Sequence, residues 1–315
     1  MRERYTNLSQ RDVHRSFWDF FCWKIGLYND PVLRQSPPID FAYPAPPLPF
    51  DEDLPSAAWM GHSTFLIAIK GFCILTDPIW DTHCAPIRLP VFKRLHEPPI
   101  ALSDLPPIDL ALISHNHYDH LDAKTVRHLH AFHPEVQWVV PLGLSKWFKR
   151  RGVERVKELG WWESVEMPCG KITAVPSQHF SGRGLWDRNK SHWNGYVLET
   201  TSPHKRFYFT GDTGYNGSDF KKIGSYFPHM DLSLIPIGTY VPQEFMQPVH
   251  CSPWEAVQIH RDVKSLLSLG MHWGTFRLSQ EPINRPPYDL FLAMQANKLP
   301  FESFLPIEPG VHVNF

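Results

Sequence analysis

The sequence predicts an α+β domain in which helices pack outside β-sheets. It begins with a hairpin-rich region, and short apolar strands then alternate with helices. The candidate ligand residues span positions 115–272, so most of the chain belongs to one fold, and we find neither a glycine-serine linker nor an internal repeat. Periodicity does not distinguish an αββα sandwich from a doubly wound sheet, so both remain open at this point.

The first predicted elements form a hairpin. Residues 58–61 and 64–69 have the composition of strands. The Lys70-Gly71 pair is expected to turn the chain, and residues 72–75 then return it as the next strand.

The next region combines strands with a capped helix. The apolar run 108–113 is typical of a buried strand. Asp122 is placed to cap a helix that runs through Val126 and Leu129, because its carboxylate can accept from free amides of the first turn. Residues 137–140 form another strand-like run.

The second half repeats this alternation. A short helix is expected over residues 144–151, with Gly152 as its stop. Residues 252–255 form a capping box with proline at the first helical position. Three further apolar runs predict strands, at residues 172–175, 206–209 and 265–270.

The most informative segment follows the apolar run 108–113. Between positions 115 and 120 it places His115, His117, Asp119 and His120 on what would be a loop at the end of a strand. Neutral imidazoles and carboxylates are good ligands for first-row metals, and zinc is the default for them. Four such side chains are too many for one open catalytic zinc with three protein ligands. The spacing therefore indicates two metal ions side by side, rather than a histidine-rich surface loop.

Three downstream residues repeat this geometry. His179, Asp212 and His272 each follow a short predicted strand. The glycines on either side of Asp212 would allow a tight turn and a close backbone approach. Each of these residues could be structural if taken alone, and their value comes from the set.

At this point the chain resembles the metallo-β-lactamase superfamily, which implies a four-layer αββα sandwich. The resemblance implies seven metal ligands, three for each of two zinc ions and one that bridges them: His115, His117 and His179; Asp119, His120 and His272; and Asp212. Iron-binding oxygen reductases of this superfamily carry glutamate where this chain has His117, which favours hydrolysis. Histidine and carboxylate ligands also suit iron and manganese.

Further motifs narrow the resemblance to one branch. Residues 60–64, 75–79, 105–109, 178–189 and 272–276 resemble the N-acyl-phosphatidylethanolamine-hydrolysing phospholipase D family and its bacterial relatives. The resemblance covers roughly residues 40–290 and implies release of N-acylethanolamine and phosphatidic acid. Two alternatives stay open. The first is a lactonase or phosphodiesterase that acts on a small soluble substrate and is similar to the ascorbate 6-phosphate lactonases. The second is a metal-binding protein without turnover.

Catalytic and substrate-binding roles follow from this interpretation. Asp119, Asp212 and His250 are the catalytic candidates, and His250 with Arg183 and Arg188 would contact the phosphodiester. Each of these last three could instead be an ordinary turn or solvated residue.

Two other features bear on the site. His62 and Asp77 could orient ligand histidines, as metal sites usually require, or serve only the hairpin turns. Val249 stands where the family has a glutamine beside the histidine, and Gln247 is the nearest substitute. This departure concerns the substrate contact more than the metal chemistry.

Composition excludes several classes of protein. With 31 basic and 32 acidic residues and a net charge of −1, the chain shows no sign of nucleic-acid binding. Its 5 cysteines include no Cys-x-x-Cys pair, which fits a reducing cytosol rather than a disulfide framework. We recognise neither a signal peptide nor an apolar run of 18 residues. A cytoplasmic enzyme that contacts a phospholipid substrate at the inner membrane face is therefore expected, and a homodimer is a reasonable prior.

We expect residues 1–55 to be an extension packed on a hydrolase domain of residues 56–315. Within the extension, the aromatic segment 17–28 could anchor the protein at a membrane interface or simply pack on its core. The proline-rich segment 37–50 should be extended along the domain surface.

Overall fold

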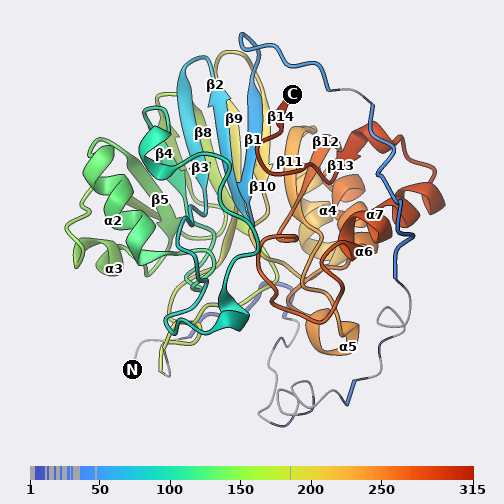
Figure 1. Ribbon diagram of the computed structural model, residues 1–315. Helices are drawn as coiled ribbons and strands as arrows, with labels where there is room; N and C mark the ends of the chain where they lie inside the picture. The colour runs from blue at the N-terminus through green and yellow to red at the C-terminus, as the bar shows by residue number, and fades with distance from the viewer. Residues whose placement is uncertain are drawn as a thin grey trace.

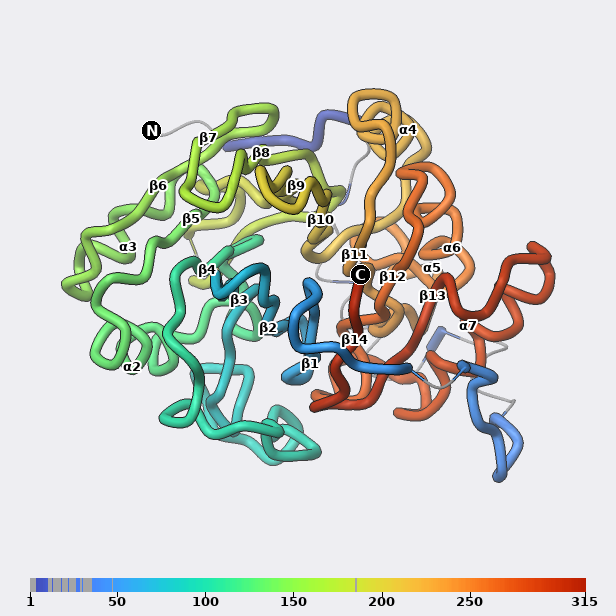
Figure 2. Tube along the Cα trace, turned by 90° about the horizontal axis from the view of Figure 1, so that it is seen from above, coloured from blue at the N-terminus to red at the C-terminus, as the bar shows by residue number. Residues whose placement is uncertain are grey.

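Two β-sheets face each other and helices cover both outer surfaces, as Figures 1 and 2 show. The computed structural model describes residues 4–10, 13, 18, 22, 27–28, 30, 36–46, 48–184 and 186–315. Within these residues each sheet has seven strands. The predicted αββα sandwich is confirmed, and the doubly wound alternative is wrong.

The first sheet is mixed. In spatial order its strands are β14 (His312–Asn314), β1 (Ser56–Gly61), β2 (Thr64–Ile69), β3 (Phe72–Thr76), β4 (Leu110–Leu112), β5 (Gln137–Pro141) and β6 (Val156–Leu159). The β1–β2–β3 hairpins are antiparallel, whereas β3 to β6 are parallel. Helices α2 (Ala123–Phe132) and α3 (Ser145–Lys149) lie on its outer face (Figure 1).

The second sheet is also mixed. Its strands are β13 (Phe304–Leu305), β12 (Ser265–Met271), β11 (Met230–Pro236), β10 (Arg206–Phe209), β9 (Asn194–Thr200), β8 (Gly170–Pro176) and β7 (Ser164–Met167). The pairing is parallel from β10 to β13 and antiparallel from β7 to β10. Helices α4 (Gly217–Tyr226), α6 (Pro253–Asp262) and α7 (Arg285–Ala296) cover its outer face, and α5 (Gln243–Met246) is a short turn beside them (Figure 1).

Strand β1 shows why the layers hold together. Ala57 and Trp59 join the apolar core between the two sheets. Ala58 and Met60 alternate with them and join a second core beneath α2 and α3. A strand whose two faces are both covered loses the alternation of apolar and polar residues. This is why the strand reads as a continuous apolar run.

The predicted helix caps are confirmed. The Asp122 carboxylate accepts hydrogen bonds from the amides of Lys124 and Thr125 at 3.1 and 2.9 Å. Ser252 and Glu255 form the capping box at the start of α6. Strand β4 is shorter than the predicted run 108–113, although the backbones of Asp109 and Ile113 still form hydrogen bonds with the neighbouring strands β3 and β5.

The proline-rich segment runs along the outside of the second half of the fold (Figure 1). The described residues of 37–50 contain no helix or strand. Phe41 packs against Tyr288 and Phe291 of α7, and the Tyr43 hydroxyl donates to the carbonyl of Phe304 at 2.8 Å. Most of the aromatic segment 17–28 lies outside the described residues. The division into 1–55 and 56–315 stays a prediction.

Within the described residues, no helix combines the length and apolar character needed to cross a bilayer.

His260 gives the fold a measurable pH dependence. It is buried between α6 and β12, where Nδ1 lies 2.8 Å from the Ser268 hydroxyl oxygen, and burial lowers its pKa from 6.5 to about 4. Below pH 6.5 this histidine binds a proton in the unfolded chain but not in the folded chain, so the free energy of unfolding decreases as the pH is lowered. We expect the free energy of unfolding to fall by ~2 kcal/mol more in wild type than in His260→Gln between pH 7 and pH 5, measured with urea. Equal losses in the two metal-free proteins would contradict this.

Candidate metal centre

The site residues come from the ends of strands in both sheets. The segment 115–120 follows β4, His179 follows β8, Asp212 follows β10 and His272 follows β12. These strands end at the same side of the sandwich, which is the lower end in Figure 1. The structure therefore brings all seven predicted ligands into one cluster that spans the two sheets.

A tight turn makes this convergence possible at Asp212. The preceding residue, Gly211, has φ +60°, and an added Cβ would lie 2.6 Å from the Cβ of Ser114. No side chain fits there. The predicted close approach is present, and it joins the strand ends of the two sheets.

Three imidazoles form the first group. His117 Nδ1 lies 2.8 Å from His115 Nε2 and 3.2 Å from His179 Nε2. Burial lowers the pKa of all three, to about 4 for His117 and well below the ordinary value for His115 and His179. Neutral imidazoles whose lone pairs converge are the form that binds a metal ion.

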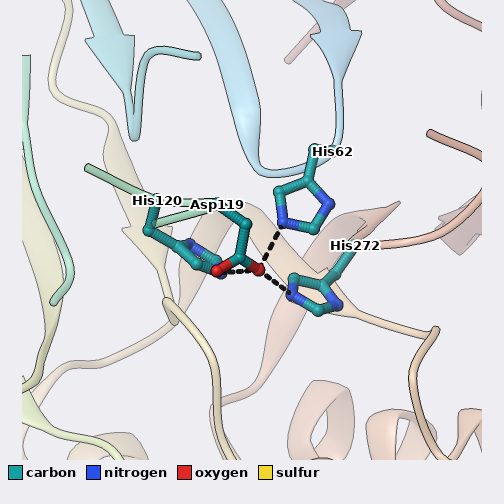
Figure 3. A group of neighbouring side chains, drawn as sticks. All are labelled: His62, Asp119, His120 and His272. Carbon is teal, nitrogen blue, oxygen red and sulfur yellow. Dashed lines mark hydrogen bonds and ion pairs between the residues drawn. The ribbon is translucent and has the colours of Figure 1, made fainter. Parts of the chain in front are cut away.

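The second group surrounds Asp119, as Figure 3 shows. Asp119 Oδ2 lies 3.0 Å from His62 Nε2, 3.3 Å from His120 Nε2 and 3.5 Å from His272 Nε2. His62 stands in the turn between β1 and β2 and is 1% exposed. The sequence placed His62 outside the ligand set, yet its ring faces the same carboxylate as the two predicted ligands.

Asp212 lies between the two groups. Its Oδ2 is 3.1 Å from the Nε2 atoms of both His120 and His272, and 3.9 Å from His179 Nε2. His250 also faces it, with Nδ1 at 3.8 Å. This is where a carboxylate that bridges two cations would have to lie.

The protonation pattern indicates that cations belong here. Burial opposes a charge on His272, but Asp212 and Asp119 raise its pKa to about 9. Burial acts in the same way on His120, whose pKa the same two carboxylates raise well above its usual value. In the metal-free protein these imidazolium protons compensate the carboxylates.

Unsatisfied polar atoms support the same conclusion. Of the buried side-chain atoms that lack a hydrogen-bond partner within the described residues, four lie in this cluster: His120 Nε2, His272 Nε2, Asp212 Oδ1 and His250 Nδ1. The two Nε2 atoms are at ion-pair distance from Asp212 but do not form a hydrogen bond of good geometry with it. Buried polar groups rarely stay unpaired. The donor set consists of imidazoles and carboxylates, and it fits a binuclear centre of zinc, iron or manganese.

Groups behind the ligands fix their orientation. Asp77 is fully buried, and its Oδ2 lies 2.6 Å from His120 Nδ1 while the Ser114 amide donates to its Oδ1 at 2.7 Å. His179 Nδ1 lies 2.9 Å from the Val249 carbonyl, and His272 Nδ1 lies 3.1 Å from the Thr239 hydroxyl. Such contacts select the tautomer that leaves the opposite nitrogen free.

The Val249 position has a simple explanation. The backbone carbonyl of Val249 contacts His179 Nδ1, and this contact does not depend on the side chain, so valine can replace the family's glutamine without changing it. The Gln247 amide donates to Glu255 at 2.9 Å, at the start of α6.

The two candidate arginines occupy different environments. Arg183 Nη1 donates to the carbonyls of Leu121, Asn116 and His117 at 2.6, 3.1 and 3.3 Å. It therefore ties the loop that carries the histidine motif. The Arg188 guanidinium lies 4.3 Å from the centre of the Phe180 ring, beside the first histidine group.

Asn7 is a residue that the sequence analysis missed. Its Nδ2 donates to the His179 carbonyl at 3.0 Å, and its Oδ1 accepts from the His179 amide at 3.2 Å and from Trp193 Nε1 at 2.9 Å. No local signal marks an asparagine 172 positions away from the ligand it holds.

Comparison with known proteins agrees with the geometry. A family profile described as "Beta-lactamase superfamily domain" matches residues 73–273. The chain belongs to the metallo-β-lactamase superfamily. It is a metal-dependent hydrolase of that superfamily, and the predicted fold and enzyme class are confirmed.

Individual relatives narrow the comparison. The chain is 41% identical over 242 residues to a Caenorhabditis elegans protein named N-acyl-phosphatidylethanolamine-hydrolyzing phospholipase D 1, covering 74% of this chain and 67% of that one. It is 35% identical to a mitochondrial protein of that name from Saccharomyces cerevisiae, covering 72% of this chain and 49% of that one. An isothiocyanate hydrolase from Delia radicum gut bacteria shares the fold with a TM-score of 0.65 at 15% identity, covering 82% of this chain and 99% of that one.

Removing the Asn7 side chain should weaken metal binding. Asn7→Ala leaves the His179 backbone without its paired amide, and we expect roughly tenfold weaker affinity for one of the two ions, the one that His179 would hold, measured by competition with a chromophoric chelator. Ser9→Ala is the control, because the Ser9 hydroxyl donates to the Gln178 side chain rather than to a ligand. Unchanged affinity in Asn7→Ala would show that the contact does not position His179.

One paired experiment should distinguish the roles of Arg183 and Arg188. Arg183→Ala removes the side-chain donor that three motif-loop carbonyls share, so we expect about tenfold weaker metal affinity. Arg188→Ala should keep the wild-type metal content and raise KM for a phosphodiester. Elemental analysis and steady-state kinetics on the same preparations measure both. Full metal content in Arg183→Ala would refute the positioning role.

Proposed function

We propose that the protein is a binuclear zinc phosphodiesterase of the phospholipase D type. It hydrolyses N-acyl-phosphatidylethanolamine to phosphatidic acid and N-acylethanolamine. The observation that carries the chemistry is Asp212, which lies between two converging groups of ligands. The substrate class is supported by the 41% identity to the Caenorhabditis elegans protein named N-acyl-phosphatidylethanolamine-hydrolyzing phospholipase D 1.

The arrangement of the ligands suits hydrolysis without a covalent intermediate. His115, His117 and His179 would hold one zinc ion and Asp119, His120 and His272 the other, with Asp212 between them. When bound, such a pair supplies an activated water molecule and offsets charge on the phosphoryl oxygens. The water oxygen joins phosphorus, the bond from phosphorus to the ethanolamide oxygen breaks, and that oxygen takes up a proton.

In this proposal His250 acts on the phosphodiester. Its side chain is largely buried beside Asp212, and burial lowers its pKa to about 4. At neutral pH it is therefore an uncharged imidazole, which can donate one N–H to a phosphoryl oxygen or to the leaving oxygen. A neutral donor adds no positive charge beside the cations.

The same site would also suit a smaller substrate. A lactonase or phosphodiesterase acting on a soluble substrate needs the same ligands, so the experiment must compare substrates directly. Phospholipid contact and a homodimer remain predictions.

Turnover should depend on Asp212 and His250 in different ways. We expect Asp212→Asn to lose N-acyl-phosphatidylethanolamine hydrolysis in mixed micelles by roughly a thousandfold, together with metal. His250→Ala should lose roughly a hundredfold in kcat with both metals retained. A bis-aryl phosphodiester and a simple lactone are assayed in parallel. Cleavage of only these soluble compounds would reject the lipid proposal and keep the metal centre.

A further inference from the structure

One loop beside the metal centre exposes apolar side chains to solvent. Every residue of Pro86–Val91 is exposed, and three of them are large and apolar: Ile87 (62%), Leu89 (49%) and Val91 (54%). We call this segment the 86–91 tip. Contiguous exposed apolar surface on a soluble protein usually marks a binding site.

The 86–91 tip stands on a well-ordered base. The Cys84 amide donates to the Phe92 carbonyl at 3.1 Å, and the Arg94 amide donates to the Thr82 carbonyl at 2.8 Å. The Phe92 side chain packs against a small buried cluster of Ile79, Cys84 and Phe276. Little conformational entropy remains to be lost when such a tip binds a surface.

The base connects directly to the metal centre. The Leu95 amide donates to the Thr275 carbonyl at 2.9 Å, and the Thr275 hydroxyl accepts from the His62 amide at 2.6 Å. The Phe276 ring lies edge-on to the His62 ring, with centroids 5.2 Å apart. The segment between β3 and β4 accordingly lies at the lower end of the molecule in Figure 1, where the ligand loops are.

The charge around the tip favours an anionic surface. No aspartate or glutamate occurs between positions 82 and 96, whereas Arg88, Lys93 and Arg94 do. Arg88 pairs with Asp81 and Arg94 is buried, so Lys93 is the exposed base at the foot of the tip. Apolar side chains with a neighbouring base match an acyl-chain boundary and an anionic headgroup.

A second loop at the same end adds an interfacial residue. Trp186 is 78% exposed in the loop that follows His179. Tryptophan is enriched at the boundary between headgroups and acyl chains. Two loops that carry exposed apolar side chains are therefore joined to segments of the metal centre.

We propose that the 86–91 tip inserts into a lipid bilayer bearing anionic headgroups and holds the metal centre at the level of the headgroup phosphates. The tip is a loop of six exposed residues in which only Arg88 is polar, and such a short apolar loop suits insertion into a fluid surface better than contact with a flat protein partner. This inference rests on the proposed function for its substrate, but the docking itself is measured without turnover.

Vesicle binding tests the docking directly. Wild type is floated with vesicles of phosphatidylcholine containing about 25% phosphatidylglycerol. We expect the double variant Ile87→Ser with Val91→Ser to partition about tenfold less strongly. Leu266→Ser is the matched control, because Leu266 is 61% exposed near the start of β12, the end of that strand away from His272. Its partitioning should equal that of wild type.

The outcomes separate docking from catalysis. Metal content and the thermal midpoint of the double variant show whether it folds. Lys93→Gln is a second, milder variant, for which we expect weaker binding to anionic vesicles only. If the double variant loses vesicle binding while wild type binds vesicles but does not hydrolyse the lipid, the docking stands and the proposed substrate is rejected. Equal binding by wild type and the double variant, or no binding by wild type, would overturn the inference. So would dimerisation that is lost in the double variant, because the tip would then be a protein interface.

Discussion

The compensation of two buried carboxylates is the constraint on which the rest of the structure depends. Asp212 has almost no solvent contact and Asp119 little, and both face histidines. An isolated buried charge is costly, so each carboxylate must be balanced by a nearby cation. Without metal, His120 and His272 provide that balance as imidazolium ions. Bound metal ions would take the place of these protons.

The fold meets this constraint by bringing strand ends from two sheets together. Each sheet alone would carry only part of the ligand set. Asp212 and His272 leave the second sheet, whereas Asp119 and His120 leave the first. The cluster therefore depends on packing between the sheets, and its contacts are backed by buried groups such as Asp77. A metal centre of this kind belongs to the whole domain rather than to one motif.

Local chemistry made much of this predictable. Short apolar runs indicated the strands, and a histidine or aspartate after four of these runs indicated the ligands. The caps at Asp122 and Ser252 could be predicted because they depend on neighbours within three residues. The sandwich itself could not be read from periodicity, since a strand covered on both faces looks alike in either architecture. Only the resemblance separated the two.

Long-range contacts were the part that the sequence could not supply. Asn7 pairs with the His179 backbone through its side-chain amide, and asparagine has many local roles that would look the same. Arg183 is similar, because three backbone carbonyls occupy the Nη1 atom that a sequence argument assigned to phosphate. Strands β9 and β11 were also missed, as they carry no candidate ligand to draw attention to them.

The most direct test of this account is a crystal structure of zinc-loaded protein with anomalous data collected at the zinc absorption edge. We expect two peaks about 3.5–4 Å apart. One would lie among His115, His117 and His179, the other among Asp119, His120 and His272, with the Asp212 carboxylate between them. A single peak, or peaks away from Asp212 in fully loaded protein, would contradict the binuclear centre.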